Sequence, residues 1–355
     1  MNALHHEIIL PRGNMRKFKF ILLLLLSFRC YSEEMMVGVG VHPTTFNGST
    51  EELISLLKTY NVETTRTDYP WSSVEKVKGN FISGNEKLES FVNISSQNGI
   101  KPLLILDYGN PLYEEATKQN PKRKPTNNNT VTAFKNYAVW TVNHFGNKVS
   151  MYEIWNEWVQ GSGKINLKTG SNTDSAKMYA NLVAETCAAI KAKNYNKKII
   201  IGSTSPSDRN ELKWLTTVLK EKGVLSCIDG ISLHIYASSP NKKLIPEKTV
   251  TAVMLFQNYI RNELDVGYNI PLYITEIGVP SLDNQYYNEH DISLYFEYIV
   301  KSFSELGYVK GIWWYDFIND GIDKTKKEHN FGILNQNLTE KPIGESMKIN
   351  KTLTK

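Results

Sequence analysis

Two glutamates stand at the ends of two apolar runs and are the strongest candidates for chemistry in this sequence. Glu157 lies in residues 151–158 (MYEIWNEW), and Glu276 lies in residues 271–278 (PLYITEIG). Two carboxylates that face one cavity are the usual equipment for cleaving a glycosidic bond. Either glutamate taken alone would equally fit a helix cap or a solvated loop. The pair becomes informative only through the elements that position it.

From Met35 onward, short apolar or β-branched runs alternate with segments of helical periodicity, and the alternation repeats eight times. Several of the short runs are continuously apolar, which is typical of parallel strands that are covered on both faces. The expected strands are residues 36–41, 62–67, 102–108, 149–155, 198–202, 230–236, 272–277 and 310–317. The expected helices are residues 50–60, 86–98, 131–145, 173–193, 209–222, 249–264 and 289–306, with a last helix near Ile343.

Eight βα units in one chain predict an α/β fold, a (β/α)8 TIM barrel that forms a single catalytic domain over residues 33–355. A doubly wound dinucleotide-binding fold is the alternative. Its glycine-rich turn is missing, because Gly38 and Gly40 lie inside the first strand rather than after it. Two long connections, 109–129 and 159–172, follow strand ends, so we expect them either to shape a binding cleft or to be surface insertions.

In a barrel of this kind, the C-terminal ends of the strands form the active-site face. Polar and aromatic residues collect at these ends in the sequence. The expected ring comprises His42, Arg66, Asp68, Asp107, Tyr108, Asn156, Glu157, His234, Tyr236, Glu276, Trp314 and Asp316. Such a ring predicts one cavity that contains both candidate glutamates.

The motifs in this ring resemble those of clan A of the glycoside hydrolases, which are retaining (β/α)8 enzymes. The resemblance covers nearly the whole chain after residue 32 and rests on Arg66, Asn156-Glu157, His234-x-Tyr236, Glu276 and Trp314, in that order on expected strands. Within the clan, residues 38–43, 66–68, 155–158, 313–316 and 328–332 look most like glycoside hydrolase family 39, particularly its exopolysaccharide-cleaving endoglycosidases. Family 5 is the alternative.

The resemblance implies that Glu157 is the acid/base and Glu276 the nucleophile of a double displacement on a β-linked poly- or oligosaccharide. A retaining enzyme needs its two carboxyl groups about 5–5.5 Å apart, with pKa values that differ. Arg66 would keep Glu276 ionised, and His234 or Tyr236 would hydrogen-bond it. The indoles that flank Glu157 in the sequence would favour its protonated form.

Other expected site residues would hold the sugar. By resemblance, Asn156 would bond the 2-hydroxyl of the sugar at the cleavage point. Trp314 would offer a flat face to a pyranose ring, and Tyr108, Tyr113 and Trp158 would extend this platform. Core packing is the alternative for each of these rings. The second-rank candidates are His42, Asp68, Asp107 and Asp316.

Competing functions are less consistent with the sequence. A metal-dependent hydrolase would need a cluster of ligands, but the expected site offers only the separate histidines His42 and His234, so we expect no metal and no cofactor. A non-catalytic carbohydrate-binding barrel would not need both glutamates. A transglycosylase would use the same residues and differ only in its acceptor, so this alternative stays open.

Residues 1–32 have the pattern of a secretory signal peptide, and we expect Met15 to be the true start. Residues 15–28 combine a basic start with an apolar run that is too short to span a bilayer. We therefore expect a secreted or periplasmic protein with no integral membrane span after cleavage. Acylation of Cys30 is disfavoured, because Arg29 is a poor neighbour for lipoprotein processing.

Charge and cysteine content limit the partners. The formal charge of +5 falls to +1 without residues 1–32, which hold five Lys or Arg and one Glu (5 − 4 = 1). A nearly neutral protein gives no reason to expect nucleic acid as a partner, and the basic run 122–124 predicts a solvated loop. We expect a monomer. Cys187 and Cys227 would either pair after export or stay as buried thiols.

Overall fold

The computed structural model describes residues 34–117, 120–159, 173–193, 196–237, 241–283 and 285–354. Eight parallel strands close into a barrel in the order β1-β10-β9-β8-β7-β6-β5-β2, which confirms the predicted (β/α)8 fold. These strands are β1 (Met36–Gly40), β2 (Thr64–Pro70), β5 (Lys101–Asp107), β6 (Met151–Ile154), β7 (Lys198–Thr204), β8 (Gly230–Tyr236), β9 (Leu272–Gly278) and β10 (Val309–Trp314). The predicted signal peptide and almost all of the connection 159–172 lie outside the described residues.

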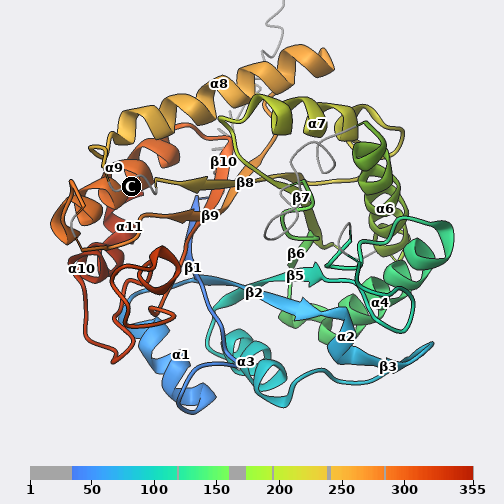
Figure 1. The fold of residues 1–355 in the computed structure, drawn as a ribbon, viewed down its shortest axis with the longest axis horizontal. Coiled ribbons are helices and arrows are strands. Elements are labelled where there is room, and N and C mark those ends of the chain that lie inside the picture. The colour runs from blue at the N-terminus through green and yellow to red at the C-terminus, as the bar shows by residue number, and fades with distance from the viewer. Residues whose placement is uncertain are drawn as a thin grey trace, which may run out of the picture. The chain divides into compact units, whose positions relative to one another are not determined.

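Helices surround the barrel, and each of the larger ones follows a barrel strand (Figure 1). They are α1 (Thr50–Thr59), α3 (Glu86–Gln97), α4 (Asn128–Phe145), α6 (Thr173–Lys191), α7 (Arg209–Lys220), α8 (Pro246–Leu264), α9 (Glu289–Glu305), α10 (Pro342–Lys348) and α11 (Asn350–Leu353). Within the described part of the chain, no helix combines the length and the apolar character that crossing a membrane requires.

The barrel interior is filled by side chains. Its buried cluster consists of Leu103, Met151, Ile200, Tyr273 and Trp313. A Cβ on Gly38 would come within 2.8 Å of the Trp313 ring, so β1 needs a glycine at this point. A larger cluster packs between the outer face of the barrel and the helices. The interior therefore supports the strand ends as a packed layer rather than an open pore.

Three short elements between β2 and α3 were not predicted: α2 (Trp71–Val74) and the hairpin of β3 (Glu75–Val77) and β4 (Asn80–Phe81). Each is only two to four residues long. Segments of this length are too short for a hydrophobic period to be visible in the sequence.

The basic run 122–124 is not the solvated loop that its charge predicted. Lys124 is buried, its Nζ donates to the backbone oxygen of Trp158 at 2.6 Å, and burial lowers its pKa to about 8. Lys122 lies over the Tyr108 ring, with Nζ 4.1 Å from the ring centroid. Both contacts use the apolar stem of lysine as well as its charge. They fix this connection against the strand ends.

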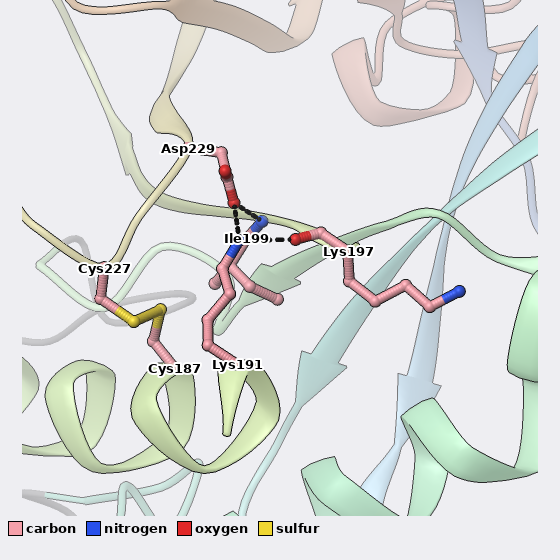
Figure 2. The surroundings of a disulfide bond; sticks show 6 residues. All are labelled: Cys187, Lys191, Lys197, Ile199, Cys227 and Asp229. Atoms are coloured by element: carbon pink, nitrogen blue, oxygen red, sulfur yellow. Dashed lines mark hydrogen bonds and ion pairs between the residues drawn. A yellow bond between two sulfur atoms is a disulfide. The ribbon is translucent and has the colours of Figure 1, made fainter. Parts of the chain in front are cut away.

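Cys187 on α6 and Cys227 ahead of β8 form a disulfide, which settles the alternative that the sequence left open. Figure 2 shows the bond beside Asp229, whose carboxylate accepts from Lys191 Nζ and from the backbone nitrogen of Ile199, each at 2.7 Å. The disulfide and these polar contacts together tie α6 to the beginnings of β7 and β8.

We predict that replacing both cysteines by serine lowers the free energy of unfolding by about 2–4 kcal/mol, because an open chain gains entropy when it unfolds. The bond closes a loop whose ends are 40 residues apart. Urea unfolding of the double variant checks this value, and wild type in excess reductant is the matched control. Equal midpoints for oxidised wild type and the variant would contradict the prediction.

Candidate active site

The C-terminal ends of the barrel strands enclose a cavity of about 500 Å³ that contains both candidate glutamates. Its described lining residues are Gly40, Val41, His42, Arg66, Thr67, Asp68, Ile105, Asn156, Glu157, Tyr236, Glu276, Tyr315, Lys327, Glu328 and Phe331. Side chains that lie far apart in the sequence thus meet on one face, as the barrel arrangement requires.

The guanidinium of Arg66 lies at the centre of the site. Nε donates to Glu153 at 2.8 Å, Nη1 to Glu276 at 2.6 Å and Nη2 to the side-chain oxygen of Asn156 at 2.9 Å. Burial alone would lower the pKa of Arg66, but the two carboxylates raise it. A planar guanidinium offers donors in several fixed directions, so one residue can hold three partners at once.

Glu276 is almost buried at the end of β9 and points into the cavity. Beside its contact with Arg66, it accepts a hydrogen bond from the Tyr236 hydroxyl, and its Oε2 lies 3.4 Å from His234 Nδ1. Burial alone would raise the pKa of Glu276, but His234 and Arg66, together with the Tyr236 hydrogen bond, lower it below its ordinary value. An ionised carboxylate is the form that a nucleophile needs.

Glu157 has an unusual backbone. Its φ is +49°, and that of Trp155 is +68°, a left-handed conformation that costs a non-glycine residue about 1–3 kcal/mol. The turn places Glu157 in the cavity wall, while Trp155 and Trp158 pack into the core. The expectation that these indoles surround Glu157 is therefore wrong. The polar partner of its carboxylate is His234, whose Nδ1 lies 2.9 Å from Oε1.

His234 stands behind both glutamates rather than in the cavity wall. One oxygen of Glu157, one oxygen of Glu276 and one ring nitrogen of His234 all lie within 4.8 Å of one another. This spacing fits the separation of about 5–5.5 Å that retaining hydrolases need and not the wider gap of inverting ones. Burial alone would lower the pKa of His234, but the two carboxylates raise it.

Glu153 is a site residue that the sequence analysis missed. It is fully buried in β6, and beside its contact with Arg66 it accepts hydrogen bonds from Ser203 at 2.8 Å and Thr275 at 3.3 Å. Glu153 therefore holds the guanidinium of Arg66 in place. A charged residue in the middle of a short apolar strand was the available signal, since carboxylates are almost never fully buried without a partner.

Two other expected sugar contacts, Asp107 and Tyr108, do not line the cavity. Asp107 is fully buried near Asp68, which lines the cavity, and burial raises the pKa of both carboxyl groups. The Tyr108 hydroxyl accepts from the side-chain nitrogen of Asn156 at 3.0 Å. Tyr108 thus orients Asn156, whereas the carboxyl oxygens of Asp107 have no hydrogen-bond partner among the described residues.

His42 does line the cavity and pairs with Asp316, Nε2 to Oδ2, at 3.3 Å. Its partly exposed imidazole is desolvated by the surrounding protein, which opposes protonation, but Asp316 raises its pKa to about 9. The contact with Asp316 therefore favours the protonated form of His42 and holds it at the edge of the cavity.

The expectation that Trp314 offers a flat face to a sugar ring is wrong. Trp314 is fully buried, donates its indole N–H to the backbone oxygen of Phe331 at 3.0 Å, and packs edge-on against Phe296 of α9. Side chains alternate along a strand, so Trp313 enters the barrel and Trp314 faces the helices.

Trp158 and Tyr113 do not line the cavity either. Trp158 is buried and donates to the Ser175 hydroxyl at 3.1 Å. Tyr113 stacks on Trp71, with 5.0 Å between ring centroids, and bonds Glu75. For both rings, the alternative of core packing holds.

The aromatic wall of the cavity consists instead of Tyr236, Tyr315 and Phe331, whose ring centroids lie 5.4–6.0 Å apart. Tyr315 follows Trp314 directly in the sequence, so the motif of residues 313–316 does reach the cavity, but through the ring of Tyr315 rather than that of Trp314. Phe331 belongs to the long segment after β10, which has no periodic pattern that would place it.

Two groups of described side chains have the ligand types that a metal ion prefers, Glu157 with His234 and Glu276, and His42 with Asp316 and Asp320. In both groups the histidine already pairs with a carboxylate. Ion pairing within the protein accounts for both arrangements without a metal.

The comparisons with known proteins agree with this geometry. A family model described as cellulase, glycosyl hydrolase family 5, matches residues 32–316. A family 39 glycoside hydrolase from the gut symbiont Bacteroides cellulosilyticus WH2 is structurally similar, with a TM-score of 0.72, 24% identity, and coverage of 90% of this chain and 64% of that one. Xylanase 10B from Thermotoga maritima is also structurally similar, with a TM-score of 0.65, 16% identity, and coverage of 91% of this chain and 97% of that one. No curated protein sequence matches the chain.

The chain belongs to glycosyl hydrolase family 5, and is thus a clan A O-glycosyl hydrolase of the retaining type. The expected clan is confirmed. Within it, the matching model is that of family 5, the alternative in the sequence analysis, whereas the likeness to family 39 is one of fold. The chain spans less than two thirds of the family 39 protein's length.

We predict that the acidic limb of kcat/KM lies below pH 4.5, the ordinary pKa of a glutamate, because the lowered pKa of Glu276 keeps it ionised until the pH falls further. Tyr236→Phe removes a hydrogen bond that favours the ionised form, so the limb moves to higher pH. Initial rates measured at about ten pH values between pH 3 and pH 8 define the acidic and the basic limb of the kcat/KM profile. A limb that stays in place in the variant would contradict this account.

We also predict that Glu153→Gln lowers the free energy of unfolding by about 3–5 kcal/mol, because it leaves part of a buried charge uncompensated. It lowers kcat about 100-fold, since the guanidinium loses its fixed plane. Urea unfolding and initial rates give both values. The matched control is Glu185→Gln, which removes the exposed partner of Lys135 and costs about 1 kcal/mol or less. Similar losses in the two variants would be inconsistent with a positioning role.

Proposed function

We propose that this protein is a secreted retaining hydrolase that cleaves a β-linked poly- or oligosaccharide by double displacement, with Glu276 as nucleophile and Glu157 as acid/base. The observation that carries the proposal is the asymmetry between the two carboxylates in one cavity. Glu276 is held by Arg66 and Tyr236, whereas Glu157 is more exposed and contacts His234. Different surroundings give the two groups different tasks.

In the first step, Glu276 attacks the anomeric carbon and forms a covalent ester to the sugar. The bond between that carbon and the glycosidic oxygen breaks, and Glu157 gives its proton to the departing oxygen. Arg66 and Tyr236 keep the attacking carboxylate ionised and oriented. Asn156, held between Arg66 and Tyr108, lines the cavity and would hydrogen-bond the sugar's 2-hydroxyl there.

In the second step, the ionised Glu157 takes a proton from water. The oxygen of that water bonds to the anomeric carbon, and Glu276 leaves as a carboxylate. His234 Nδ1 lies near both glutamates, so its N–H can donate to Glu276 before the first step and to Glu157 after it.

The substrate class follows from the family and the form of the site. The matching family model is described as cellulase, and the similar solved structures include xylanases. Both names refer to β-linked polysaccharides, so we infer a β-linked glycan here, with an exopolysaccharide among the candidates. A cavity that is polar and lined by aromatic rings on one side suits a pyranose.

Export is supported by the cysteines. The disulfide between Cys187 and Cys227 is of the kind that persists in oxidising compartments, and the N-terminal pattern is that of an export signal. We therefore propose a secreted or periplasmic location.

The proposed mechanism predicts that wild type first releases the product with retained configuration, and that Glu276→Gln loses several orders of magnitude in kcat, because no covalent intermediate forms. Proton NMR of the first product from a panel of β-glycans and aryl β-glycosides gives the configuration. Release of the inverted anomer would rule out double displacement.

Glu157→Ala separates the two roles in the same assay. It should keep activity on aryl glycosides with good leaving groups when azide is added, because azide replaces the water that needs a base. If azide instead rescued Glu276→Gln with retained configuration, the two assignments would have to be exchanged.

A further inference from the structure

Lys341, at the N-cap of α10, is a buried lysine that plays no part in the two catalytic steps. Its Nζ donates to the side-chain oxygen of Asn319 at 2.8 Å and to the backbone oxygen of Asn330 at 3.2 Å. Both acceptors are uncharged, and no carboxylate of the described residues lies within ion-pair distance of this nitrogen. Lysine is almost never fully buried without an opposite charge, so these two contacts are unusual.

The two acceptors of Lys341 lie at the base of a loop, residues 320–329, in the segment that follows β10. Asn319 precedes this loop and Asn330 follows it. The Asn319 side-chain oxygen also accepts from the backbone nitrogen of Gly332 at 2.9 Å. The ammonium group therefore joins the two limbs of the loop at its base.

The loop and the limb that follows it carry part of the catalytic cavity. Three of their residues line that cavity: Lys327, Glu328 and Phe331. Phe331 comes directly after Asn330, and its ring packs edge-on against Tyr236 and Tyr315, with centroids 5.4 and 5.5 Å away. Phe331 also lines a small cavity, of about 10 Å³, whose wall includes Lys341. The lysine therefore lies beside the residue that completes the aromatic wall, but it does not line the catalytic cavity itself.

The charges around Lys341 do not compensate its own. Burial lowers the pKa of Lys341 to about 7, with a further lowering from Lys324 and an opposing effect of Glu289. Glu289, at the start of α9, already accepts from the Ser281 hydroxyl at 2.6 Å and lies 3.7 Å from Lys324 Nζ. The other charged groups of the neighbouring segments are exposed or have partners of their own: Asp320, Glu345, His329 with the backbone of Asp323, Asp316 with His42, Asp323 with Lys326, Glu328 with Lys327, and Glu340 with Lys348.

The lowered pKa means that Lys341 costs stability instead of adding to it. The ordinary pKa of this side chain is 10.5, so between about pH 7 and pH 10.5 the unfolded chain holds a proton that the folded chain has lost. The cost is therefore complete below about pH 7 and falls as the pH rises toward 10.5. An apolar side chain would avoid this cost, so stability does not account for a lysine at this place.

We propose that Lys341 is a positioning residue for the hydrolysis: it fixes the loop of residues 320–329 and the limb after it, so that Phe331 completes the aromatic wall that receives the sugar. The inference rests on the proposed function. The ammonium group touches neither the reacting carboxylates nor the catalytic cavity, so it acts through Asn319 and Asn330. Its loss should therefore weaken substrate binding more than it slows the chemical steps.

Lys341→Met tests this role, because methionine is a long side chain that donates no hydrogen bond. The variant should fold, since Asn319 and Asn330 each keep a second donor, the backbone nitrogens of Gly332 and Ser281. Its urea midpoint at about pH 6 should equal or exceed that of wild type, and this gain should shrink by about pH 9. KM for an aryl β-glycoside should rise about fivefold or more, the value of one lost hydrogen bond, while kcat changes less than about twofold. Lys341→Gln, which can still donate, should raise KM less.

Lys197→Met is the matched control. Lys197 is also buried, burial lowers its pKa, and its Nζ donates to the backbone oxygens of Gly146 and Val149 at 2.6 and 2.8 Å. It directly precedes β7, at the end of the barrel opposite the site, so KM should stay within about twofold of wild type. In a double-mutant cycle, Asn319→Ala and Lys341→Met should raise KM by less than the product of their separate effects, because both remove the same contact.

Hydrogen exchange followed by mass spectrometry provides a readout that needs no substrate. Peptides from residues 316–334 should exchange faster in Lys341→Met than in wild type, and Lys197→Met should leave them unchanged. Unchanged exchange or unchanged KM in Lys341→Met, a KM effect that the Lys197 control shares, or independent effects in the cycle would overturn the positioning role. If wild type cleaves no glycan, the proposed hydrolysis fails, and the exchange rates alone decide whether Lys341 fixes the loop.

Discussion

One buried cation organises the site. Arg66 enters from β2, and its guanidinium joins Glu153 of β6, Glu276 of β9 and Asn156 after β6. Removing such groups from water costs several kcal/mol per ion, and the cost is offset only because each donor direction has an acceptor. The side chains around Arg66 therefore have few other arrangements that would satisfy every donor and acceptor. Arg66 holds together three strands and, in the same geometry, keeps one carboxylate charged at the floor of a cavity.

Glu157, the proposed acid/base, is positioned in a different way. Glu157 is not clamped by the guanidinium; it reaches the cavity because the backbone at Trp155 and Glu157 is left-handed. The surrounding core stabilises this strained turn, since the two indoles and Tyr179 pack against one another behind it. Backbone strain thus positions Glu157, and ion pairing positions Glu276. The two glutamates lie a short distance apart in unlike surroundings.

Much of this could be predicted from the sequence, because strand number and strand ends leave a local pattern. Eight apolar runs gave the barrel, and the residues at their ends gave Arg66, Glu157 and Glu276 as neighbours. The failures share a physical cause. The direction of a side chain beyond a strand end depends on tertiary packing, so Trp314 was chosen where Tyr315 lines the cavity. Glu153 was missed because a carboxylate inside an apolar strand signals a buried charge but does not say which residue pairs with it, and the fold is what places Arg66 beside it.

The central claim is that Glu276 forms a covalent bond to the sugar. A 2-deoxy-2-fluoro β-glycoside with a good leaving group slows both steps and the second more than the first, so the intermediate accumulates. Mass spectrometry of the inactivated enzyme, followed by peptide mapping, is the direct measurement. The account predicts one added glycosyl group on the peptide that contains Glu276. A label on Glu157, or inactivation that requires no Glu276, would contradict it.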